Sequence, residues 1–186
     1  MTMDIAVLGW GSLIWDPSDL NISGDWHENG PELPVEFARL SGRGRLTLVI
    51  HEQADPVQVL WARSAYNELD LAIDNLRSRE RTIETYIGYY NFQNDEHHTQ
   101  FPFILDSIKC WGSSQNVDAA IWTDLPSNFL DKTDHDELNK ETVIDVLRNS
   151  THINQENAEE YIRKTPEQVC TSFRHTIEEE LGWYSS

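Results

Sequence analysis

The feature that most constrains the fold is a short apolar run followed by a glycine-rich turn. Residues 5–8 are apolar, contain β-branched side chains and are too few for a helix, so they predict a buried strand. Gly9 and Gly11 follow, and glycine allows a sharp turn and a close approach to the backbone. Ser12 and the amides around it then face outward as donors for a carboxylate or an oxyanion. The alternative is a hairpin turn that needs glycine only for its dihedral angles.

The composition limits the class of protein. The chain has 186 residues, of which 39% are hydrophobic, and this is enough for one domain with a sizeable core. Thirty-two acidic and 14 basic residues give a formal net charge of −18. Such a surface repels phosphate backbones and anionic lipid, so we expect no nucleic-acid and no membrane partner. The sequence lacks an apolar run of about 18 residues and a basic N-terminal leader, which predicts a cytoplasmic protein.

The sequence does not indicate a metal site. Cys110 and Cys170 have no partner at the spacing of a metal site, so we expect reduced thiols. His97 and His98 lie beside two acidic residues. Neighbouring residues on a strand point in opposite directions, however, and this favours a solvated hairpin tip.

Several further short segments have the composition of strands. Closely spaced turn residues separate them, which favours an antiparallel or mixed sheet, with closure as a small barrel as one outcome. Residues 18–34 have the composition of a surface loop, and residues 101–108 that of an extended or mixed segment. Strands are expected at residues 33–40, 45–50, 57–66, 82–90 and 118–123.

A helical pattern begins at Asn67, which can cap a helix. Leu69, Ile73 and Leu76 follow at spacings of four and three residues, and they form one apolar stripe. Extending this stripe by four residues places Glu80 at its end.

Glu80 is a candidate general acid and base because of this position. A carboxyl group at the end of an apolar stripe is partly withdrawn from water. Desolvation raises its pKa toward the range that proton transfer near neutral pH requires. The alternative is a solvated ion pair with Arg77, Arg79 or Arg81, since arginines are common near a helix C-terminus.

The last third of the chain has helical patterns. No linker-like stretch divides it from the strands, so we expect one α+β domain over residues 1–186. Its barrel-like core would be residues 1–125, with the helices of residues 136–184 packed on that core. Helices are expected at residues 139–147, 154–162 and 166–181.

Four stretches occur in a recognisable order. They are Gly-Trp-Gly-Ser-Leu-Ile-Trp at 9–15, then residues 41–48, then residues 59–66, and Leu-Arg-Ser-Arg-Glu at 76–80. Together they resemble the gamma-glutamylcyclotransferase-like family, most of all its glutathione-acting branch. That family typically has Tyr-Gly-Ser-Leu after its first strand and an Arg-Glu pair on a helix after the fourth. The resemblance covers about residues 4–90.

Two departures from the family pattern leave the substrate open. Trp10 stands in place of the family's tyrosine, which removes a hydroxyl and keeps an aromatic wall. Arg81, Thr82 and Ile83 follow Glu80, where the glutathione-acting branch usually has glycines and a tyrosine.

The resemblance implies a small mixed β-barrel flanked by helices, with no cofactor. It also implies an intramolecular acyl transfer on a small-molecule γ-glutamyl substrate, with release of 5-oxoproline. Glu80 would transfer the proton, a role typically worth about 10²–10⁴-fold in rate. The substrate-binding residues implied are Gly9, Trp10, Gly11, Ser12, Leu13 and Arg43, with Arg45 as the alternative to Arg43 for binding a carboxylate.

Three other interpretations stay open. The same residues fit a non-catalytic module that binds a small carboxylate or a peptide end. A dinucleotide site at Gly9-x-Gly11 lacks the third glycine, because Ile14 stands there. A hydrolase with Ser12 as nucleophile lacks the glycine two residues after the serine, and no histidine can be assigned as its base.

Overall fold

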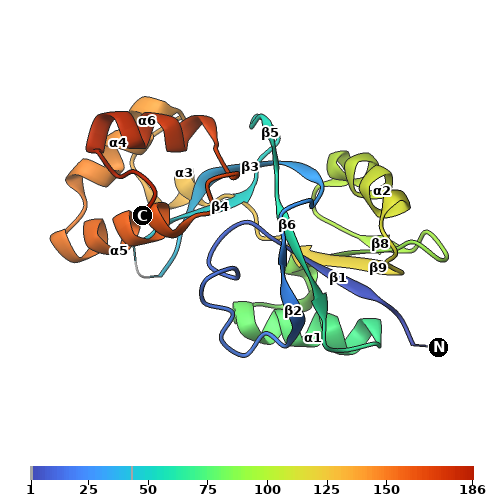
Figure 1. The fold of residues 1–186 in the computed structure, drawn as a ribbon. Coiled ribbons are helices and arrows are strands. Elements are labelled where there is room, and N and C mark those ends of the chain that lie inside the picture. The colour runs from blue at the N-terminus through green and yellow to red at the C-terminus, as the bar shows by residue number, and fades with distance from the viewer. Residues whose placement is uncertain (1, 43) are drawn as a thin grey trace. The chain divides into compact units, whose positions relative to one another are not determined.

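The computed structural model describes residues 2–42 and 44–186 (Figure 1). The chain divides into two compact units. Unit 1 contains the residues up to Leu33 together with Gln58–Leu125, and unit 2 contains Pro34–Val57 together with Pro126–Ser186. Each unit combines helices with strands, so the expected α+β class is confirmed. The expectation of one domain stays a prediction.

Unit 1 is built on a six-stranded mixed sheet. The strands are β1 (Ile5–Gly9), β2 (Ile22–His27), β6 (Leu60–Ser64), β7 (Ile87–Asn91), β8 (His97–His98) and β9 (Ala119–Thr123). Their order is β2-β6-β1-β9-β7-β8. The predicted first strand, β1, pairs antiparallel with β6 and parallel with β9. All of β1 is buried, which accounts for its continuous apolar sequence.

Two helices cover this sheet, α1 (Leu69–Glu80) and α2 (Leu105–Ser114), and they lie on opposite sides of it (Figure 1). Ala72, Ile73 and Leu76 are the buried residues of α1, and they belong to one apolar cluster with side chains of β1 and β9. The predicted apolar stripe is therefore confirmed. The predicted cap is wrong, because the N-cap is Glu68 rather than Asn67, and its side chain makes no capping hydrogen bond.

Three elements of unit 1 differ from the sequence predictions. The expected loop at residues 18–34 contains β2, an edge strand whose central residues are exposed and therefore lack an apolar alternation. A single turn, η1 (Glu84–Tyr86), precedes β7 within the expected strand at 82–90. The segment expected to be extended forms the turn η2 (Pro102–Ile104) and then α2. Tertiary packing favours α2 despite Gly112, because the Phe92 ring fills the space that a side chain there would occupy.

The second sheet, in the order β4-β3-β5, lies mostly in unit 2 with helices α3 to α6. β3 pairs antiparallel with β4, with Val35 opposite Ile50. Asn139 caps α4 through a capping box, whereas α5 is capped by Thr151 rather than beginning at Asn154. The elements are β3 (Glu32–Leu40), β4 (Leu46–Ile50), β5 (Pro56–Gln58), α3 (Phe129–Lys132), α4 (Lys140–Asn149), α5 (His152–Lys164) and α6 (Ser172–Leu181). Both sheets are open, and the described strands form no closed barrel.

The last helix, α6, begins after Thr171 rather than at Pro166. Arg174 is buried, and its guanidinium donates to the carbonyls of Pro166 at 2.7 Å and Val169 at 3.0 Å. These bonds hold the preceding backbone in a non-helical conformation, while the Thr171 hydroxyl caps the helix. Gly182 ends α6 in the left-handed region at φ 70°, as the sequence predicts.

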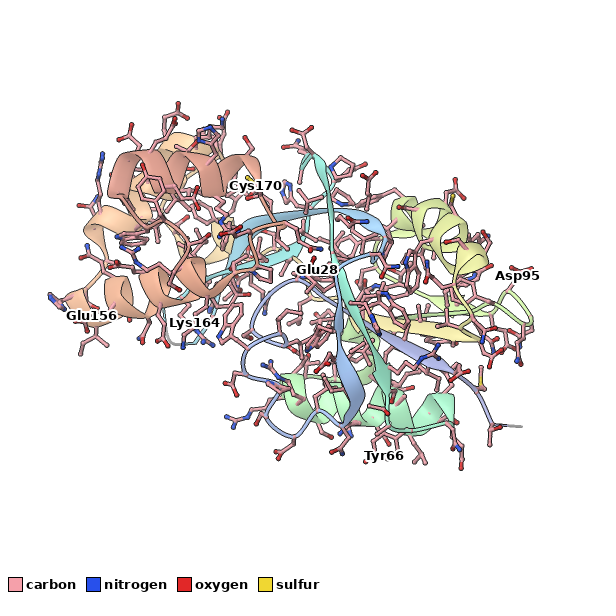
Figure 2. All side chains as sticks on the ribbon, in the orientation of Figure 1. Glu28, Tyr66, Asp95, Glu156, Lys164 and Cys170 are labelled. Atoms are coloured by element: carbon pink, nitrogen blue, oxygen red, sulfur yellow. The ribbon has the colours of Figure 1, made fainter. Side chains whose placement is uncertain are left out.

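The surface has many acidic side chains, in keeping with the net charge of −18. Asp95 of unit 1 and Glu156 of unit 2 project outward in Figure 2. Cys110 and Cys170 are both free and exposed. Among the residues described, no helix is long and apolar enough to cross a membrane, and no three His, Cys, Asp or Glu side chains could together hold a metal ion.

Glu36 is a buried carboxyl group in unit 2, with 3% of its surface exposed. It accepts hydrogen bonds from the amides of Phe37 at 2.8 Å and Phe173 at 3.1 Å, and from the Thr171 hydroxyl. Because Thr171 and Phe173 lie at the start of α6, the carboxyl group joins β3 to the N-terminus of that helix, where negative charge is favourable. Burial nevertheless raises the pKa of Glu36 above its ordinary value.

A raised pKa in the folded state makes stability depend on pH. The folded protein binds this proton more tightly than the unfolded chain, so the contribution of Glu36 to the free energy of unfolding falls as pH rises from about 4.5 through the folded pKa. In Glu36→Gln this dependence is lost. We expect the stability advantage of the wild type over the variant to shrink across that window, as measured by urea unfolding at a series of pH values. Glu141→Gln, which removes the same charge from an exposed position of α4, is the control. A wild-type advantage that grows with pH would contradict the assignment.

Candidate active site

The strand β1 and the helix α1, both predicted from the sequence, end at one edge of the unit 1 sheet. β1 and β9 are parallel neighbours, with Ile5 opposite Ala119 and Val7 opposite Ile121. Parallel strands present their carboxyl ends at the same edge, so Gly9 at the end of β1 lies beside the end of β9. The helix α1 packs on β9, and its apolar stripe ends at the same place.

Glu80 is the last residue of α1, and 15% of its side chain is exposed. Arg81 ends the helix in the left-handed conformation at φ 52°, and its amide bonds the carbonyl of Ser78. The carboxyl group is therefore mostly withdrawn from water and still reaches the surface, as the apolar spacing predicts.

Arg79 connects Glu80 to the glycine-rich turn. Its Nη1 donates to Glu80 Oε1 at 2.9 Å, and its Nη2 donates to Ser12 Oγ at 3.2 Å. Nη2 also donates to the Asp16 carbonyl at 2.6 Å. One guanidinium group thus joins the two stretches that the sequence analysis singled out. The ion pair between Arg79 and Glu80 was expected as the alternative to a buried carboxyl group, and the structure shows both together, because the pair is shielded from solvent.

The pKa of Glu80 is raised, and burial is the largest cause. The positive charge of Arg79 and its hydrogen bond lower this pKa in opposition to burial. The Thr123 hydroxyl at the end of β9 also lowers it, although that hydroxyl makes no hydrogen bond of ordinary geometry within the described chain. Thr123 was not predicted from the sequence, because its place beside Glu80 follows only from the pairing of β1 with β9.

The turn after β1 begins with Gly11 and Ser12. The Ile14 amide donates to the Gly11 carbonyl at 3.0 Å, and the Asp16 amide donates to the Ser12 carbonyl at 2.9 Å. The amides of Gly11, Ser12 and Leu13 have no acceptor among residues 2–42 and 44–186. Their role as donors to a bound ligand stays a prediction.

The other predicted binding residues have different surroundings. Trp10 and Leu13 are buried, with 5% and 6% of their surfaces exposed, and Leu13 belongs to the apolar cluster of unit 1. A Cβ at Gly9 would lie 2.8 Å from the Trp26 ring, so a tryptophan of the same unit fills the space that the glycine leaves. Arg43 lies outside the described residues.

Asp124 is a second buried carboxyl group in unit 1, and it is completely covered. It accepts hydrogen bonds from the Thr99 hydroxyl at 3.0 Å, the Gln100 amide at 2.5 Å and the Trp122 indole at 2.8 Å. Burial raises its pKa as well. Because both oxygens are occupied by donors of the protein, we assign Asp124 a structural role. Glu80 is the buried acid of this unit that retains access to solvent.

No family model, no curated protein and no solved structure matches this chain. We therefore infer its function from the residues around Glu80 themselves.

The contact between Gly9 and Trp26 predicts a stability effect. In Gly9→Ala the new methyl group must displace the indole, and overpacking of this kind costs about 1–3 kcal/mol of the free energy of unfolding. Gly42→Ala is the matched control, because no atom of the described residues beyond its chain neighbours lies within 4 Å of a Cβ there, and its effect should stay within about 0.5 kcal/mol. Urea unfolding of both variants measures the difference.

A double variant tests the cause. In a Trp26→Leu background the cost of Gly9→Ala should fall, because the smaller side chain leaves room for the methyl group. An equal cost in both backgrounds would show that the indole is not what the glycine accommodates.

Proposed function

We propose that this protein is a cofactor-free γ-glutamyl cyclotransferase-type enzyme with a gamma-glutamylcyclotransferase-like fold, active in the cytoplasm on a small-molecule γ-glutamyl amide or peptide. The observation that supports this most is the shared guanidinium of Arg79, which bonds Glu80 on one side and Ser12 on the other. The carboxyl group proposed for proton transfer and the turn that carries the proposed backbone donors are thereby connected.

The reaction is an intramolecular acyl transfer. The α-amino nitrogen of the γ-glutamyl group attacks its own γ-carbonyl carbon, and a new C–N bond closes the five-membered ring. The bond between that carbon and the leaving nitrogen then breaks. The proton lost by the attacking nitrogen is gained by the leaving nitrogen, so the products are 5-oxoproline and a free amine, and water is not consumed.

Glu80 suits both proton steps. It must accept a proton from the attacking nitrogen and donate one to the leaving nitrogen, and a carboxyl group with a raised pKa can do each near neutral pH. It lies at the end of α1 with 15% of its side chain exposed, and the proposed substrate would approach the carboxyl group from this side.

The turn after β1 suits the binding of negatively charged groups during the reaction. The amides of Gly11, Ser12 and Leu13 are donors for the substrate's carboxylate or for the oxygen that becomes negative during attack. Because both reacting groups belong to one molecule, holding the substrate in a folded conformation supplies much of the remaining acceleration. Glutathione is one candidate substrate. Because Trp10 stands where the resembling family has a tyrosine, other γ-glutamyl amines are equally good candidates.

A second candidate function is a non-catalytic module that binds a small carboxylate. The ion pair favours it, because Arg79 already occupies one oxygen of Glu80. This module would use the same amides and would leave Glu80 as a structural partner of the arginine.

Release of 5-oxoproline from γ-glutamyl amines, γ-glutamyl dipeptides and glutathione separates the two functions. We expect the wild type to turn over at least one of these substrates. Glu80→Gln should lower kcat/KM by about 10²–10⁴-fold, because the amide cannot accept the proton. Glu68→Gln, at the exposed N-cap of the same helix, should leave kcat/KM unchanged. A folded wild type without activity toward the whole panel would favour the binding module, and an active Glu80→Gln would remove Glu80 from the mechanism.

A further inference from the structure

We propose that Arg79 is a positioning residue, whose guanidinium holds the turn at Ser12 in a fixed place against the Glu80 carboxyl group. This inference rests on the proposed function. Arg79 is an expected ion-pair partner of Glu80 and the arginine of the Arg-Glu pair in the resemblance, and neither expectation gives it a role in the reaction.

The geometry of the hydrogen bonds supports this role. The Asp16 amide donates to the Ser12 carbonyl, so these two residues form the ends of one turn. Nη2 of Arg79 bonds the Ser12 hydroxyl at one end and the Asp16 carbonyl at the other, while Nη1 bonds Glu80. The turn therefore has two attachments to the guanidinium plane, and the carboxyl group has one. A planar guanidinium can direct several donors at fixed angles, which a lysine ammonium on a flexible stem cannot do in the same way.

Burial distinguishes this pair from an ordinary surface ion pair. The side chains of Arg79 and Glu80 are 11% and 15% exposed, so solvent screens them little. The neighbouring Arg77 forms its own pair with Asp74 at 3.1 Å, but these side chains are 38% and 62% exposed. Two arginines on one helix thus differ in what they contact, and only Arg79 reaches the turn.

Arg79 is also not arranged for stability alone. Its Nε is buried and has no hydrogen-bond partner in the described part of the chain, and an unsatisfied buried donor is unfavourable.

The arginine has a second effect on Glu80, through charge. Among residues 2–42 and 44–186, the side chains that act on the pKa of this carboxyl group are Arg79 on α1 and Thr123 on β9, and both lower it against burial. Without the arginine charge the pKa of Glu80 rises further. A base with a higher pKa is ionised over a narrower range, so the acidic limb of the pH profile moves to higher pH.

The experiment compares the wild type with Arg79→Lys, Arg79→Gln and Arg77→Gln. kcat/KM for 5-oxoproline release is measured across the pH range, with the best substrate of the panel. Both Arg79 variants should lose about 10²-fold in kcat/KM, because the turn is no longer held at the reacting distance. The acidic limb should move to higher pH in Arg79→Gln and stay near that of the wild type in Arg79→Lys, which keeps the charge. Arg77→Gln, the matched control, should equal the wild type.

A second measurement follows the Glu80 carboxyl carbon by NMR titration in the same four proteins, and it does not depend on turnover. We expect a higher Glu80 pKa in Arg79→Gln than in Arg79→Lys or the wild type. Arg79→Lys keeps the inference testable if Arg79→Gln does not fold.

The outcomes separate the two proposals. An active wild type with Arg79 variants of unchanged kcat/KM and unchanged acidic limb would overturn the role of Arg79 and leave the proposed function standing. An inactive wild type would overturn the proposed function. A Glu80 titration identical in all four proteins would overturn the charge effect of Arg79 on this carboxyl group.

Discussion

The parallel pairing of β1 with β9 is the constraint on which the candidate site depends. It places the turn after Gly9 beside the end of β9, and α1 packs its apolar stripe against the same two strands. The apolar stripe fixes which face of α1 packs on the sheet. Glu80, which continues the stripe at the C-terminus of the helix, therefore faces the same edge of the sheet. Glu80 and Ser12 are 68 positions apart in the chain by their numbers (80 minus 12) and meet through one arginine.

Three buried carboxyl groups show that burial alone does not identify a catalytic acid. Glu36, Glu80 and Asp124 all have a raised pKa, and desolvation is the largest cause in each case. Glu36 and Asp124 are almost or completely covered and accept several donors of the protein, so they stabilise local structure. Glu80 keeps partial exposure and has an arginine that opposes the desolvation. This balance, rather than the size of any one shift, is what proton transfer requires.

Local sequence patterns predicted the elements that local contacts stabilise. They did not predict the elements whose structure depends on contacts with distant residues. The apolar stripe of α1 and the start of a helix at Asn139 were predictable because each signal lies within a few consecutive residues. The strand β2 was missed because it is held by pairing with β6, and α2 was missed because Phe92 packs against Gly112 from outside the helix. At the site, the position of Glu80 at the end of the apolar stripe was predictable from the spacing of apolar residues. The hydrogen bonds of Arg79 to the turn were not, because they depend on the pairing of β1 with β9.

The most direct test of the central claim is to follow the γ-carbonyl oxygen. A γ-glutamyl substrate is converted in water enriched in ¹⁸O, and the products are examined by mass spectrometry. Intramolecular attack predicts 5-oxoproline without ¹⁸O, because no water enters the bond that forms. Glutamate that contains ¹⁸O would contradict the account, since it would show attack by water or hydrolysis of an enzyme-bound acyl group instead of cyclisation.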